Sequence, residues 1–194
     1  FPSMRFPLIT GVSAGAINAV FLAAHPGPLE RSTRDLAALW LDLDVDDVVV
    51  SNLRSLAGNF LRWTQRRGCG GEIGPPARAL RDTTPLHGLL ARALCGDEGA
   101  ANGEGRIEGI ARNLEAGHLQ ALALTTVDYG TGRTVHWVEG RDFQPWSASN
   151  RIARRVSMRL DHVMASSALP LVFPAIRLDD GWYGDGGIRM AAPL

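Results

Sequence analysis

The sequence predicts one α/β domain in which helices cover a central sheet in three layers. Its 194 residues, 45% of them hydrophobic and 21% charged, are enough for one buried core. Short strand-like runs alternate along the chain with longer runs of helix-forming residues, which is the pattern of α/β domains. No internal repeat or low-complexity tract interrupts this alternation. We therefore expect residues 1–194 to form a single domain.

The first half of the chain reads as one strand followed by helices. The apolar run Phe6–Thr10 has the length of a buried strand. The helix predicted after this strand ends at the sequence HPGP, residues 25–28. Ser32 stands three residues before Asp35, the spacing of a capping box, and Thr84 is expected to cap a later helix. Helices are predicted at residues 14–25, 32–43, 52–63, 84–94 and 106–117.

The second half adds two hairpins. Residues 119–140 contain two β-rich runs joined by a DYGTG turn, which predicts the first hairpin. A helix is expected from about Asp161 to a break at Pro170, and a second hairpin should turn at residues 179–181. Arginines at 151, 154, 155 and 159 have helical spacing and are expected on a solvated helix face.

Composition and charge exclude several function classes. Twenty basic and twenty acidic residues cancel, and every basic one is arginine, so neither nucleic-acid binding nor lysine chemistry is expected. Cys69 and Cys95 lie far apart and outside any C-x-x-C motif, so we expect two free thiols, no metal and no cofactor. The longest apolar run, Ala14–Ala24, is too short to cross a bilayer. We favour a cytoplasmic location, although the native N-terminus is not visible in the sequence.

The pentad Gly11-Val12-Ser13-Ala14-Gly15 fits G-x-S-x-G, the nucleophile elbow that presents a serine on a sharp strand-to-helix turn. A strand-like run precedes it and a helix-like run follows it, as the motif requires. Ser13 would therefore stand at a helix N-terminus, where free N–H groups, that of Ala14 included, favour an oxyanion. The alternative is a glycine-rich turn that only packs a helix on a strand. We interpret Ser13 as a nucleophile.

A serine nucleophile needs a base to take its proton. None of the five histidines has a distinctive sequence context, but His162, directly after Asp161, leaves a Ser-His-Asp esterase open as an alternative. Asp185 lies between Gly184 and the pair Gly186-Gly187, so other segments can approach its backbone closely. The triplet Asp-Gly-Gly is also common in ordinary turns.

Three segments taken in order resemble the patatin-like phospholipase family: GVSAGAINA at 11–19, HVMASSALPLVFPAI at 162–176 and GDGG at 184–187. The resemblance extends from residue 8 to residue 193. It implies a patatin-like fold with a mostly parallel central sheet, and a catalytic dyad of Ser13 and Asp185. It also implies hydrolysis of lipid or phospholipid acyl esters through an acyl-enzyme, with peripheral membrane contact.

The chain departs from this family pattern upstream of the elbow. Patatin-like proteins carry a glycine-rich oxyanion loop there, whereas the ten residues before Gly11 contain no glycine. We expect a truncated chain that lacks this loop and a C-terminal remainder. The alternative from another class is a catalytically inactive lipid-binding or scaffold domain that keeps the elbow without an oxyanion hole.

Overall fold

The computed structural model describes residues 6–42, 84–101, 105–170, 172–179 and 181–189. The predicted helix at 52–63 and Cys69 lie outside these residues, while Cys95 is a free, half-buried thiol. The described elements are β1 (Leu8–Gly11), α1 (Ala14–Ala24), α2 (Leu29–Leu41), α5 (Thr84–Ala101), α6 (Glu108–Glu115), β2 (Ala121–Asp128), β3 (Thr134–Gly140), β4 (Trp146–Ser147), β5 (Arg151–Arg155), α7 (Leu160–Ser166), β6 (Ile176–Leu178), β7 (Gly181–Asp185) and the 3-10 turn η1 (Gly186–Ile188).

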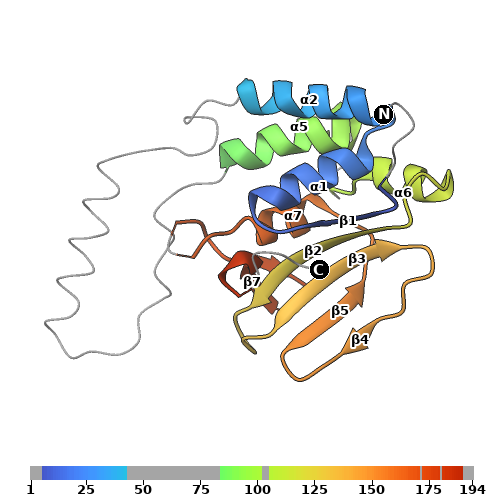
Figure 1. Cartoon of the computed structure of the whole chain (residues 1–194). Coiled ribbons are helices and arrows are strands. Elements are labelled where there is room, and N and C mark those ends of the chain that lie inside the picture. The colour runs from blue at the N-terminus through green and yellow to red at the C-terminus, as the bar shows by residue number, and fades with distance from the viewer. Residues whose placement is uncertain (1–5, 43–83, 102–104, 171, 180, 190–194) are drawn as a thin grey trace, which may run out of the picture.

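The strands form one seven-stranded sheet, and Figure 1 shows α1, α2, α5 and α7 on one side of it. The α/β class is confirmed. The sheet is mixed, however, and not mostly parallel as predicted: β1 with β2 and β3 with β5 are its parallel pairs. The hairpins β2–β3 and β6–β7 pair antiparallel because a short turn joins their strands. A helix layer on the other face of the sheet is not among the described residues.

Most predicted elements are found, and two predictions are corrected. Residues 151–155 form the strand β5 and not a helix, since each of them pairs with a residue of β3. Successive side chains of a strand point to opposite faces of the sheet, so the arginines do not share one face. The helix α2 begins at Leu29, so Ser32 lies in its first turn and does not cap it. The Ser32 hydroxyl instead donates to the Leu29 carbonyl.

The strand β2 lies at the centre of the site's architecture. One edge of β2 pairs with β3, and its other edge is shared by two strands, β1 along its first half and β7 along its last residues. The parallel strand β1 ends with Gly11 opposite Leu124, and the antiparallel strand β7 ends with Asp185 opposite Thr126. The carboxyl ends of β1 and β7 therefore face each other across the position of Thr125.

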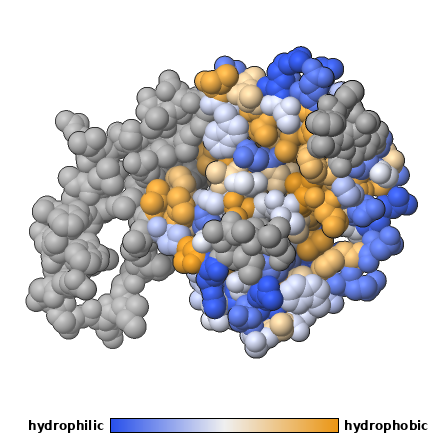
Figure 2. Space-filling view, viewed as in Figure 1, coloured by the Kyte–Doolittle hydropathy of each residue, from blue (hydrophilic) through white to orange (hydrophobic). Residues whose placement is uncertain are grey.

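The core lies between the sheet and α1 and α7. Leu122, Leu124 and Trp137 are fully buried on the sheet face that these helices cover, and burial of such side chains is the main favourable term in folding. Figure 2 shows polar side chains mainly at the rim of the molecule and apolar ones nearer the middle of the view. No helix of the described residues is long and apolar enough to cross a membrane.

Candidate active site

Ser13 occupies the bend between β1 and α1, as the pentad predicts. Its backbone has φ 56° and ψ −133°, a region that residues with a Cβ rarely adopt and that costs ~1 to 3 kcal/mol. Ser13 directly precedes the first residue of α1, Ala14. The Ala16 N–H donates to the Ser13 carbonyl oxygen. The N–H groups of Ala14 and Gly15, which precede it, have no carbonyl partner within the helix and are available to an anion at this end.

The two glycines of the pentad have different roles. A Cβ on Gly11 would stand 2.5 Å from the Gly15 carbonyl oxygen and 2.7 Å from the Cα of Ala16, so only glycine lets α1 pack this closely on β1. A Cβ on Gly15 would meet no atom within 4 Å. Gly11 is thus required by packing, whereas Gly15 leaves open space beside Ser13.

Asp185 lies at the end of β7 with only 1% of its surface exposed. Its Oδ2 accepts a hydrogen bond of 2.6 Å from Ser13 Oγ, 172 residues away in the chain. Its Oδ1 accepts from the Gly187 N–H at 2.7 Å, which fixes the plane of the carboxylate. A Cβ on Gly186 would come within 2.5 Å of the Thr125 carbonyl oxygen, so the triplet at 185–187 serves close packing against β2.

A turn at the end of α7, which sequence reasoning did not single out as functional, contacts both of these residues. The Ser13 N–H donates to Ser166, the Ser167 hydroxyl donates to the Ser13 carbonyl oxygen, and the Ala168 carbonyl accepts from the Asp185 N–H. One signal for these residues was present in the sequence: two adjacent serines stand within the apolar run MASSALP. Both are buried, and a buried hydroxyl needs a hydrogen-bond partner.

His162, the alternative base, has a different set of contacts. Its Nδ1 accepts a hydrogen bond from the Arg159 N–H at the start of α7, and its ring packs on Trp137 with centroids 5.0 Å apart. Burial, and to a smaller extent the nearby Arg159 guanidinium, lower the pKa of His162 to about 4. Among the described residues, the hydrogen bonds of Ser13 go to Ser166, Ser167, Asp185 and Ala16, and not to a histidine.

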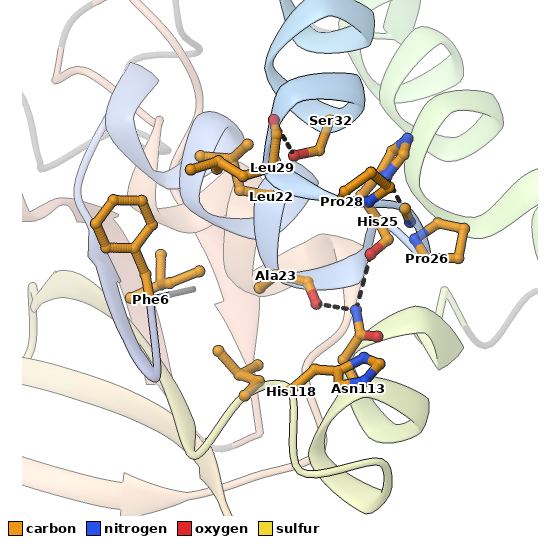
Figure 3. A pocket seen from close by; sticks show the side chains of 13 residues that line it. Phe6, Leu22, Ala23, His25, Pro26, Pro28, Leu29, Ser32, Asn113 and His118 are labelled. Atoms are coloured by element: carbon orange, nitrogen blue, oxygen red, sulfur yellow. Dashed lines mark hydrogen bonds between the residues drawn. The ribbon is translucent and has the colours of Figure 1, made fainter. Parts of the chain in front are cut away.

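The larger described cavity lies elsewhere. It has a volume of about 410 Å³ and lies at the C-terminal end of α1, the opposite end of that helix from Ser13. Figure 3 shows it lined by Phe6, His25, Asn113 and His118 among others. Its polar side chains satisfy backbone groups at the end of α1: Asn113 Nδ2 donates to the carbonyls of Ala23 and His25. No group of three or more His, Cys, Asp or Glu suited to a metal occurs among the described residues.

Comparison of the sequence with models of known families identifies one family. The model of the family described as patatin-like phospholipase matches residues 2–194, so the chain belongs to that family. Membership supports lipid acyl hydrolysis as the general activity and lipid as the class of substrate. Comparison with curated proteins gives no match.

Proposed function

We propose that residues 1–194 form a single patatin-like catalytic domain that hydrolyses acyl esters of lipids or phospholipids with a Ser13–Asp185 dyad. The observation that carries this proposal is the 2.6 Å hydrogen bond from Ser13 Oγ to Asp185 Oδ2. A carboxylate at that distance is within reach of the proton it must remove. Ser13 is half-buried and Gly15, two residues on, is exposed, so this end of α1 is accessible to a substrate.

The reaction follows two half-cycles. Asp185 takes the Ser13 proton while Oγ attacks the ester carbonyl carbon, and the protonated carboxyl then gives that proton to the leaving alcohol, which produces the acyl-enzyme. In the second half Asp185 takes a proton from water, and the resulting attack releases the fatty acid and returns the proton to Ser13. The first N–H groups of α1, that of Ala14 above all, stabilise the oxyanion in both halves.

The arrangement also explains why no histidine is needed. Asp185 is held on one oxygen by the Gly187 N–H and contacts Ser13 with the other, so its orientation does not depend on an imidazole. His162 lies with its Nδ1 committed to the first turn of α7. A peripheral membrane contact remains part of the proposal, because the substrate is a lipid.

Turnover of p-nitrophenyl esters and of phospholipid vesicles tests the proposal. Ser13→Ala should reduce hydrolysis to background, because the nucleophilic oxygen is lost. Ser32→Ala is the control, since Ser32 is a buried serine in α2 whose hydroxyl donates to the Leu29 carbonyl and does not contact Asp185. Wild-type protein that binds vesicles and does not hydrolyse any ester would contradict the proposal and favour the inactive lipid-binding alternative.

A further inference from the structure

We infer that Ser166 and Ser167 are positioning residues, which clamp the backbone of Ser13 from both sides and hold its hydroxyl against Asp185. This inference rests on the proposed function, because it assigns a role within the same reaction. We call the three-residue turn Ser166–Ala168, together with its bonds to Ser13 and Asp185, the serine clamp.

The N–H side of the clamp is formed by Ser166. The Ser13 N–H donates to the Ser166 carbonyl oxygen at 3.1 Å and to the Ser166 Oγ at 3.3 Å. The Ser166 hydroxyl donates its own proton to the Thr125 carbonyl at 2.8 Å. Because this proton is directed at Thr125, an oxygen lone pair of Ser166 is left to face Ser13.

The carbonyl side of the clamp is formed by Ser167. Its hydroxyl donates to the Ser13 carbonyl oxygen at 3.1 Å, an oxygen that also accepts from the Ala16 N–H at 2.9 Å. Ser167 otherwise borders a small void lined by apolar side chains, among them Met164 and Phe173. With apolar neighbours on that side, the Ser167 hydroxyl is directed to the Ser13 carbonyl.

The same turn fixes the base. The residue after Ser167, Ala168, accepts a hydrogen bond of 2.9 Å from the Asp185 N–H. Three consecutive residues thus hold the backbones of both dyad members, which lie 172 residues apart in sequence. The distance between Ser13 Oγ and Asp185 Oδ2 is therefore set by one short turn and not by two independent loops.

The clamp meets a need that the elbow creates. Ser13 is held at φ 56°, and such a backbone persists only where its surroundings determine it fully. Release of one side allows the peptide to relax and moves Oγ relative to Asp185, and a displacement of about 1 Å costs about a hundredfold in rate. Ser166 is completely buried and Ser167 is 9% exposed, and both hydroxyls donate to carbonyl oxygens, so neither serves as a nucleophile itself.

The test compares Ser166→Ala, Ser167→Ala and Ser167→Thr with wild type and with the control Ser32→Ala. Active sites are titrated with a fluorophosphonate, so that kcat is expressed per reactive Ser13, and KM and the melting temperature are measured on the same samples. We expect Ser167→Ala to lose about tenfold to a hundredfold in kcat per titrated site with KM changed less than about twofold, because its hydroxyl bond to the Ser13 carbonyl is lost. Ser166→Ala should lose less, because the Ser166 backbone carbonyl still accepts the Ser13 N–H. Ser167→Thr, which keeps the hydroxyl, should retain most of the wild-type kcat.

Two outcomes would overturn the inference about Ser166 and Ser167. Alanine variants with fewer titrated sites or a lower melting temperature, but with wild-type kcat per site, would overturn the inference, because they describe a structural role alone. If Ser166→Ala does not fold, Ser167→Ala decides in the same way. Wild-type protein without turnover and without label on Ser13 would overturn the proposed function itself, and the inference with it.

Discussion

The two ends of the helix α1 differ in how their polar groups are arranged. At the N-terminal end, segments far apart in sequence converge on the backbone and hydroxyl of one residue, Ser13. At the C-terminal end, next to a cavity of about 410 Å³, His25 bonds Asp35 and the Gly27 N–H, both within ten residues of it. Asn113 bonds the last carbonyls of the helix there.

The cavity of about 410 Å³ therefore lies away from the proposed Ser13–Asp185 dyad. The groups at the C-terminal end satisfy backbone atoms and one another, which is what the end of a helix requires. Those at the N-terminal end hold a strained backbone and direct a carboxylate at a hydroxyl. The strained backbone of Ser13 and its hydroxyl contact with the Asp185 carboxylate favour the N-terminal end of α1 as the reactive one.

The largest expected effect separates the two aspartates, one at each end of α1. Asp185→Asn should lower kcat for ester hydrolysis by about 10²- to 10⁴-fold, because the amide does not take the Ser13 proton. Asp35 Oδ2 lies 3.0 Å from His25 Nε2 at the other end of α1. Asp35→Asn should leave kcat within about twofold. Steady-state kinetics of both variants measure this. Equal losses in the two variants would remove the distinction between the two ends.

The next largest effect concerns packing beneath the elbow. Gly11→Ala should lower the free energy of unfolding by about 3 kcal/mol, because the new Cβ would overlap the backbone of Gly15 and Ala16. The matched variant Gly15→Ala has open space around its Cβ and should be neutral or up to about 1 kcal/mol more stable. Urea unfolding measures both. A stable Gly11→Ala variant would show that the close packing of α1 on β1 is not required.

The smallest effect is a pH dependence that originates at His162. The pKa of His162 is lowered to about 4, so below its ordinary value near 6.5 the unfolded chain takes up a proton that the folded chain does not. The resulting stabilisation is present above pH 6.5 and is lost as the pH falls, by about 2 kcal/mol between pH 7 and pH 5.

His162→Asn tests this, because the amide oxygen can accept the Arg159 N–H bond and does not titrate. Urea unfolding at pH 7 and pH 5 should give a smaller difference for the variant than for wild type, while kcat stays within about twofold. Loss of hydrolysis in His162→Asn, with activity retained in Asp185→Asn, would instead indicate a histidine base.

Much of the fold could be predicted from the sequence, because its signals are local. Both hairpins, the elbow and the helix beginning near Asp161 follow from turn residues and periodicity. The structure has the hairpins at β2–β3 and β6–β7, the elbow between β1 and α1, and the helix as α7. The arginines misled the prediction: three of the four, at 151, 154 and 155, lie in β5. Helical spacing of charged residues does not by itself exclude a strand. Pairing with β3, a tertiary contact, decides between the two.

The sequence predicts the two residues of the candidate site, Ser13 and Asp185, but not the turn at the end of α7 that holds them. The G-x-S-x-G pentad predicts Ser13, whereas Asp185 is assigned through the resemblance to patatin-like proteins, and the structure brings the two side chains together. The head-to-head meeting of β1 and β7 beside Thr125 depends on strand order, which no local pattern encodes. The serine clamp depends in addition on where α7 ends relative to both strands, so the family-like segment at 162–176 does not by itself reveal the contacts of Ser166 and Ser167.

The most direct test of the Ser13–Asp185 dyad is the site and rate of covalent labelling by a fluorophosphonate, located by peptide mass spectrometry. We expect the phosphonate on Ser13, with a labelling rate at least about 10²-fold slower in Asp185→Asn because no base then removes the proton. Label on a different residue, or an unchanged rate in Asp185→Asn, would contradict the dyad.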